Sequence, residues 1–247
     1  MSGPIGNIDK GRPQFTPPES GAEFNMIEDV IYARRSVRYY KKKQLPEYLF
    51  RRILEAGRFA PSAGNGQPWK FVVVQNRQML DEMTEDILAM LKRIKKIADY
   101  IEPGQGKKAW VAKALQRANN NMFHPIPFGA MKYIAEGKLG VWHDAPTVIM
   151  LLADERCPGH PAIDIGIAGT NMVLTAHSFG LGACWVSFAT PLNMMPKWKK
   201  KLGIKYPYKL HTSIALGYPQ GAPDGYVQRE TQAIDWFDED GGFRIVY

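Results

Sequence analysis

Cysteine is scarce in this chain, with only Cys157 and Cys184 among 247 residues. Two cysteines cannot by themselves form a zinc framework or hold an iron–sulfur cluster, since such sites draw on about four ligands. Their spacing is not typical of a disulfide-rich fold. The sequence therefore predicts neither a metal centre nor a disulfide scaffold.

Long hydrophobic runs are also missing. No apolar stretch approaches the roughly 20 residues that cross a bilayer. The first ten residues, Met1–Lys10, hold no apolar segment typical of a secretory signal peptide. We therefore expect a cytoplasmic protein that has no membrane partner.

Acidic residues are outnumbered, which gives a net charge of +8. The basic residues gather at positions 41–43, 92–96, 107–108 and 197–201. A solvated surface accounts for such runs. The functional alternatives are that the basic residues attract an acidic electron-carrier protein or that they attract nucleic acid. No zinc finger, RRM signature or basic heptad region accompanies the charge, so we expect no nucleic-acid partner.

The distribution of apolar residues predicts one mixed domain of helices and strands, because 247 residues with 45% hydrophobic content can bury one full core, or at most two. Helices are expected over residues 25–34, from 46 onward with Leu49 and Ile53 on the inner face, and over 79–100, 163–179 and 191–202. Strands are expected over 71–75, where the strand should be buried, and over 147–153, 183–188 and 212–216.

Three segments fall outside this pattern. Residues 1–24 are rich in glycine and proline and should form an extended arm, while the tail 221–247 holds aromatic residues that need a partner surface. Between 101 and 140, Pro103-Gly104 and Pro125-Ile126-Pro127 should break the chain. That region is either a surface excursion or a lid over a substrate. The candidate substrate contacts in it are Phe123, His124, Phe128 and Tyr133.

The loop Ala60–Trp69 stands between an expected helix and an expected strand. Its small, glycine- and proline-punctuated sequence lets backbone N–H groups approach a ligand closely. Two further features carry arginine: the segment Ala33–Arg38 upstream and Arg229 downstream. Together they form a candidate cradle for a phosphorylated, aromatic cofactor.

Four motifs in this order resemble the nitroreductase superfamily of FMN-dependent enzymes. They are Arg34-Arg35-Ser36-Val37-Arg38, the loop Ala60–Trp69, Gly180-Leu181-Gly182-Ala183-Cys184-Trp185, and Gly217-Tyr218-Pro219 followed by Arg229. The resemblance covers about residues 26–232 and is poor between 90 and 140. It implies an α+β fold, with a mixed, largely antiparallel sheet flanked by helices in an intertwined homodimer. The FMN-binding domain would be 25–220, with the lid at 101–140 and with the tail 221–247 wrapped around the partner subunit.

The resemblance also implies an FMN site shared by two subunits. The phosphate and the flavin edge would be held by Arg34, Arg35, Ser36, Arg38 and Arg229, whose guanidinium forks suit planar acceptors. From the second subunit, Pro61, Ser62, Ala63 and Asn65 would face the flavin, with Gln67 supporting the loop.

The segment Ser187–Asn193 resembles the iodotyrosine deiodinase branch of this superfamily. On that correspondence Phe188 and Ala189 lie beside the cofactor, and Thr190 donates a hydrogen bond to flavin N5, which tunes its redox chemistry. Alternatively or in addition, Thr190 caps a helix that begins at Pro191. The glutamate, tyrosine and lysine of the deiodinase lid have no clear counterparts in 101–140, so deiodination is not implied.

The implied function is an FMN-dependent oxidoreductase that reduces an electron-poor small molecule: a nitroaromatic, a quinone, an enone or a halogenated aromatic. Electrons would come from NAD(P)H or from a ferredoxin-like donor. The chain also resembles ferredoxin-fused nitroreductases but lacks their cysteine-rich module, so such a donor would be a separate acidic ferredoxin or flavodoxin. The alternatives are a flavin-consuming or flavin-storing protein on the same scaffold, and a basic nucleic-acid-binding protein without cofactor.

Overall fold

The computed structural model of the chain describes residues 8–9, 12–13, 25–101, 125–221 and 233–246. The centre of the fold is a four-stranded sheet in the order β3-β4-β6-β5. The strands are β3 (Trp69–Val74), β4 (Thr147–Asp154), β5 (Gly182–Val186) and β6 (Tyr208–Gly217), and every neighbouring pair is antiparallel. A single parallel bridge joins Ser36 to Ala183 outside these strands. The predicted mixed, largely antiparallel sheet is confirmed.

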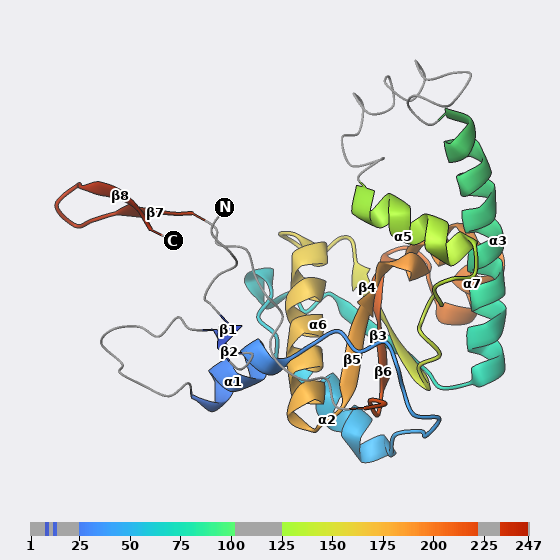
Figure 1. The fold of residues 1–247 in the computed structure, drawn as a ribbon, viewed down its shortest axis with the longest axis horizontal. Helices are drawn as coiled ribbons and strands as arrows, with labels where there is room; N and C mark the ends of the chain where they lie inside the picture. The colour runs from blue at the N-terminus through green and yellow to red at the C-terminus, as the bar shows by residue number, and fades with distance from the viewer. Residues whose placement is uncertain (1–7, 10–11, 14–24, 102–124, 222–232, 247) are drawn as a thin grey trace.

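Strand β4 divides the hydrophobic core into two layers because successive side chains of a strand point to opposite faces. Val148, Met150 and Leu152 pack with α3 (Arg77–Ile101), α5 (Pro125–Ala135) and α7 (Pro196–Leu202). Ile149, Leu151 and Ala153 pack with α2 (Glu47–Arg58) and α6 (Pro161–Ser178). The sheet is thus covered by helices on both faces, as Figure 1 shows.

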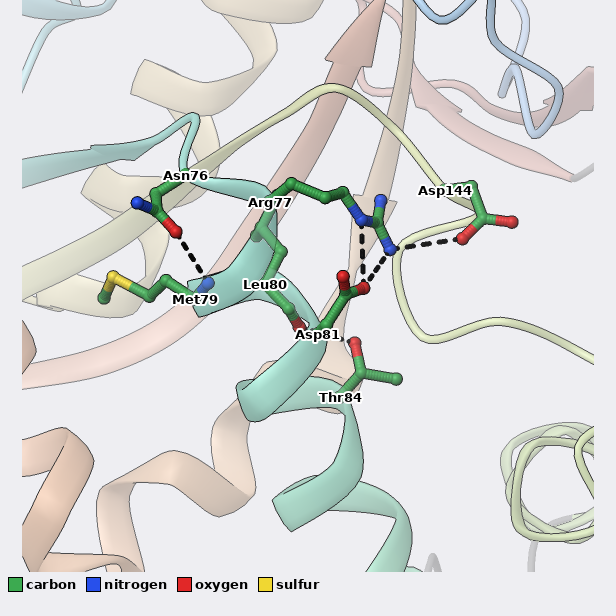
Figure 2. Close-up of polar contacts among 7 residues, drawn as sticks. All are labelled: Asn76, Arg77, Met79, Leu80, Asp81, Thr84 and Asp144. Atoms are coloured by element: carbon green, nitrogen blue, oxygen red, sulfur yellow. Dashed lines mark hydrogen bonds and ion pairs between the residues drawn. The ribbon is translucent and has the colours of Figure 1, made fainter.

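Two helices, α1 (Met26–Ala33) and α3, begin at asparagine side chains that accept hydrogen bonds from the first turn. Helix α1 begins with a capping box, in which Asn25 Oδ1 accepts from Glu28 N (3.1 Å) and Glu28 Oε2 accepts from Asn25 N (2.8 Å). Helix α3 begins two residues before the predicted start. Figure 2 shows Asn76 Oδ1 accepting from Met79 N (2.8 Å), and Arg77 lying between Asp81 and Asp144.

Three predictions about the elements were wrong. The strand expected to be buried over 71–75 is only half-buried apart from Val74, because β3 is an edge strand. Pro125 and Pro127 open helix α5 rather than break the chain, since proline fits the first turn of a helix. The helix expected over 191–202 is two elements, a 3-10 helix η2 (Ser187–Met194) and α7, which starts anew at Pro196.

Two short hairpins lie in the terminal segments. Strands β1 (Ile8–Asp9) and β2 (Arg12–Pro13) pair within the expected arm. Strands β7 (Ile234–Phe237) and β8 (Phe243–Val246) pair within the tail, where sequence patterning predicted no strand. Figure 1 shows the β7–β8 hairpin standing apart from the sheet and its helices. Within the described segments, no helix has the length and apolarity that spanning a bilayer requires.

Candidate cofactor site

The arginine strip, residues 34–38, leaves α1 and runs alongside the beginning of β5. Val37 N donates to Ala183 O (3.0 Å). The approach is so close that a Cβ on Gly182 would lie 2.7 Å from Val37 Cγ1 and 2.8 Å from Val37 Cβ. Further along, Tyr40 Oη donates to Val37 O (2.6 Å) and to Ala215 O (3.3 Å). Main-chain contacts with the sheet therefore fix the position of the strip.

The guanidinium groups of Arg34 and Arg38 act on nearby titratable side chains. Burial raises the pKa of the Cys184 thiol, although Arg38 and Arg34 oppose the rise and Ser36 hydrogen-bonds the thiol. The pKa of His177 is lowered by burial and then by Arg34. Burial and then Arg38 also lower the pKa of His143, against the opposing charge of Asp144. Arg34 and Arg38 thus favour the neutral form of the histidines and the anionic form of the thiol, as a positive potential does, and such a potential suits an anionic group.

The small-residue loop, residues 61–67, is an exposed and tightly turned segment between α2 and β3. Asn65 and Gln67 adopt φ values of 54° and 47°. Ser62 Oγ accepts from Gln67 N (3.0 Å), and Asn65 Oδ1 accepts from Gln67 Nε2 (3.1 Å). Gln67 thus supports the loop, in line with the role predicted for it.

A second loop lies beneath the small-residue loop. A Cβ on Gly66 would strike Cys157 Sγ, and a Cβ on Gly159 would strike the Cβ of Ala63. The packing of loop 157–159 was missed at the sequence level, although the Pro158-Gly159 turn in this segment is a local signal for a tight approach. Cys157 is a packing residue of this loop pair.

Strip and loop lie at diagonally opposite corners of the sheet. The strip meets Ala183, whose register partner Leu216 pairs with Thr147 at the beginning of β4. The loop leads into Trp69, which pairs with Ala153 at the other end of β4. Six residues along β4 span about 20 Å, and three strand spacings from β3 to β5 add about 14 Å across the sheet.

The 3-10 helix η2 continues directly from β5 and carries the predicted flavin neighbours. Phe188 is half-buried, Ala189 is buried and Thr190 is exposed. Asn193 fastens this helix: its Nδ2 donates to Thr190 O (3.0 Å) and Leu210 O (2.8 Å), and its Oδ1 accepts from Leu210 N (3.0 Å). Asn193 was part of the recognised motif, but its structural role was not predicted.

The alternative role of Thr190 as a helix cap is wrong. Val186 occupies the N-cap position of η2, and Met195 occupies that of α7. Thr190 lies inside η2, because Pro191 fits within its 3-10 turns and the new helix starts only at Pro196. That the Thr190 hydroxyl lies next to the cofactor therefore stays a prediction.

Most of the remaining candidates fall in parts of the chain that the structure does not describe. Phe123, His124 and Arg229 lie outside the described residues, as does the side chain of Phe128. Tyr133 lies on α5 with 56% of its surface exposed, and Lys138 Nζ is 5.6 Å from the centre of its ring. Among the described residues, no group of three or more His, Cys, Asp or Glu could hold a metal ion.

The fold of this chain, an antiparallel sheet between helices, is shared with nitroreductases that were solved with bound FMN. The nitroreductase of Bacteroides fragilis, solved with bound FMN, is 26% identical with a TM-score of 0.57, over 85% of this chain and 95% of that one. An FMN-bound nitroreductase of Desulfitobacterium hafniense has a TM-score of 0.60 at 22% identity, over 83% of this chain and 95% of that one.

Sequence comparison leads to the same class. The model of the Nitroreductase family matches residues 31–218, which span both the arginine strip and the small-residue loop. A protein of Methanothermobacter thermautotrophicus, provisionally named NADH dehydrogenase/NAD(P)H nitroreductase, is 29% identical over 80% of this chain and 79% of its own length. This chain belongs to the nitroreductase family. The predicted family and fold are confirmed.

Proposed function

We propose that this protein is an FMN-dependent oxidoreductase that reduces an electron-poor small molecule with electrons from NAD(P)H. The observation that carries the proposal is the arginine strip, held by the main chain against β5 in a member of the nitroreductase family. FMN-bound relatives with the same fold support the cofactor. The names of relatives support NAD(P)H as the donor.

The chemistry of the strip fits FMN. Arg34, Arg38 and Ser36 supply two guanidinium groups and a hydroxyl, which are hydrogen-bond donors suited to a phosphate or an electron-rich ring edge. Arg38 and Ser36 are exposed, so an anion can reach them from solvent. Arg35 lies on the same strip and is assigned to the same cofactor, as is Arg229 further along the chain.

We further propose that the working unit is a homodimer with the cofactor between two copies. The strip and the loop of one copy are separated by about 20 Å along the sheet, so they cannot both border one ring system. A second copy that brings its loop to the strip of the first completes the site. The exposed apolar residues of the β7–β8 hairpin support a tail that wraps around this second copy.

Each residue then has a limited task. The strip holds the phosphate, and Pro61, Ser62, Ala63 and Asn65 of the second copy border the ring with small groups. Thr190, fixed by the η2–β6 contacts of Asn193, holds a proton at flavin N5. Bound FMN supplies the redox chemistry, taking up two electrons from NAD(P)H and passing them to the acceptor.

The acceptor class follows from the cofactor face, where a flat, electron-poor molecule stacks after NAD(P)H leaves. Nitroaromatics, quinones, enones and halogenated aromatics meet this description. The side chains proposed to meet the substrate are Phe123, His124, Phe128 and Tyr133, all from the 101–140 segment.

Anaerobic titration of the FMN-loaded protein with NADH and NADPH tests the proposal. Bleaching of the flavin absorbance at stoichiometric nucleotide, followed by reoxidation with a nitroaromatic or a quinone, is the expected result. Flavin that is bound but consumed during turnover would instead support a flavin-consuming protein. A preparation that binds no FMN would overturn the proposal.

A further inference from the structure

A groove lined largely by apolar side chains runs between α3 and the junction of η2 with α7, with a volume of about 590 Å³. Met90 and Ile94 of α3 form one wall, and Met194 and Met195 form the other. Met194 is 73% exposed. Trp198 is fully buried, and its Nε1 donates to Asp86 Oδ2 (2.7 Å). The groove is therefore a well-defined part of the fold, and the methionine side chains of its walls are flexible enough to adapt to a partner surface.

Charged side chains lie in and beside this groove: Asp86, Arg93 and Lys197 line it, and Lys199 and Lys200 line a neighbouring pocket that shares Pro196 with it. Helix α7 carries Lys197, Lys199, Lys200 and Lys201 within seven residues, and Arg93 lines the α3 side. Lys197 is neutralised locally, by Glu82 Oε2 (3.1 Å) and Asp86 Oδ2 (3.5 Å). Within the described part of the chain, no ion pair engages Arg93, Lys199 or Lys200. The α7 surface beside the groove therefore carries an excess of positive charge.

The groove is continuous with the segment assigned to the flavin. Met194, at its edge, is the last residue of η2, and Thr190 lies four residues earlier in that helix. Four residues of 3-10 helix span about 8 Å. A protein seated in the groove would approach the flavin without entering the cofactor site.

We propose that this groove docks a small acidic one-electron carrier protein, which feeds electrons to the flavin as a second route beside NAD(P)H. The proposal rests on the proposed function, because the route ends at FMN. Acidic side chains of the carrier pair with Lys199, Lys200 and Arg93, while an apolar residue fills the methionine groove. A second copy of this chain is a poor occupant, since its own net charge of +8 opposes approach to a basic face.

The electron balance is simple. Each docking event transfers one electron from one reduced carrier molecule to the cofactor. Two events and two protons from water convert oxidised FMN to its two-electron-reduced form, and two carrier molecules leave oxidised. The acceptor then takes both electrons, as in the NAD(P)H reaction.

A reduced plant-type two-iron ferredoxin is the probe, and the rate of flavin bleaching under anaerobic conditions is the measurement. We expect the double variant Lys199→Glu/Lys200→Glu to lower this rate about tenfold or more at low salt, since steering by surface charge contributes on that scale. The control Lys41→Glu/Lys42→Glu makes the same charge change on two other exposed lysines and should alter the rate less than about twofold. Bleaching by NADH should be unchanged in both variants.

A second variant distinguishes apolar contact in the groove from charge pairing with the lysines. Met194→Ala leaves every lysine in place, so it should lower the ferredoxin rate while the dependence on ionic strength keeps its slope. Equal losses in the lysine variant and its control would overturn the proposal. So would a wild-type flavin that dithionite bleaches and ferredoxin does not, or a lysine variant that dissociates a dimer. Absence of FMN from the protein would instead contradict the proposed function.

Discussion

The arginine strip and the small-residue loop are assigned to the same cofactor, yet they are held in place by different forces. A main-chain hydrogen bond and close packing against Gly182 hold the strip to β5. The loop is held by its own side-chain hydrogen bonds and by the loop 157–159 beneath it. The strip therefore shares the rigidity of the sheet, whereas the loop can be altered without disturbing the sheet.

The largest effect is expected when the positive charge of the arginine strip is removed. Arg34→Ala/Arg38→Ala should raise the Kd for FMN by about 10²–10⁴-fold, because each charge-assisted hydrogen bond contributes about 1.5–3 kcal/mol. Quenching of FMN fluorescence measures the Kd. Arg51→Ala is the control, since Arg51 is exposed and pairs with Glu47 on α2. Equal affinity of the strip variant and the control would contradict the assignment.

Packing of the strip is broken by Gly182→Ala. The new Cβ would meet both Cγ1 and Cβ of Val37, and the latter cannot rotate away. We expect a loss of about 1–3 kcal/mol in the free energy of unfolding together with weaker FMN binding. Urea denaturation measures the first quantity. Val37→Ala should restore only part of the loss, because the Val37 Cβ remains.

Packing of the loop is broken by Gly66→Ala, and here the outcome should differ. The new Cβ overlaps Cys157 Sγ and otherwise lies 3.2 Å from Ala63 O and 3.7 Å from Pro158 Cδ, and the backbone at Gly66 has an ordinary helical φ of −70°. Cys157→Ala in the same chain should therefore restore most of the lost stability. A double-mutant cycle with a coupling energy near zero would show that the two loops do not pack as described.

The strip could be predicted from sequence because its signal is chemical and local. Arginines at 34, 35 and 38 with Ser36 among them are donors that suit a phosphate, and together with the family resemblance they predict an FMN-binding role that stays a prediction. Likewise, the strands over 147–153 and 212–216 were predicted correctly, since buried central strands are continuous apolar runs.

The support beneath the loop could not be predicted, because it depends on long-range packing. Gly66 and Cys157 meet only once β3 and β4 have paired. The same reason explains the half-buried β3, since its edge position is a property of the whole sheet. The β7–β8 hairpin was missed because the described side chains of its four-residue strands are exposed and lack the alternation of a half-buried strand.

A smaller effect concerns the tail. The hairpin exposes Trp236 (48%), Phe237 (75%) and Phe243 (56%), and an isolated two-stranded hairpin is only marginally stable in water. Trp236→Ser/Phe237→Ser should weaken self-association while leaving the core of each copy folded. Sedimentation equilibrium and circular dichroism measure the two properties. Unchanged association would remove the tail from the proposed interface.

The smallest effect is a dependence on pH near the strip. The pKa values of His143 and His177 lie below the ordinary value of about 6.5, mainly because of burial. The unfolded chain therefore binds more protons than the folded chain just below pH 6.5, so the free energy of unfolding falls as the pH drops. Replacing both histidines with glutamine should flatten this fall. An equally steep fall in the variant, measured by urea denaturation between pH 7.5 and 5.5, would contradict the assignment.

Subunit complementation tests the composite site most directly. Arg34→Ala/Arg38→Ala disables the strip, and Pro61→Trp blocks the exposed start of the loop. Neither variant alone should bind FMN tightly, but a mixed dimer keeps one intact site built from the unaltered strip of one copy and the unaltered loop of the other. Equal mixing followed by subunit exchange should recover about one quarter of wild-type FMN capacity, because half of the dimers are mixed and each has one of two sites. Exchange that is verified but recovers no binding would contradict a site shared between two copies.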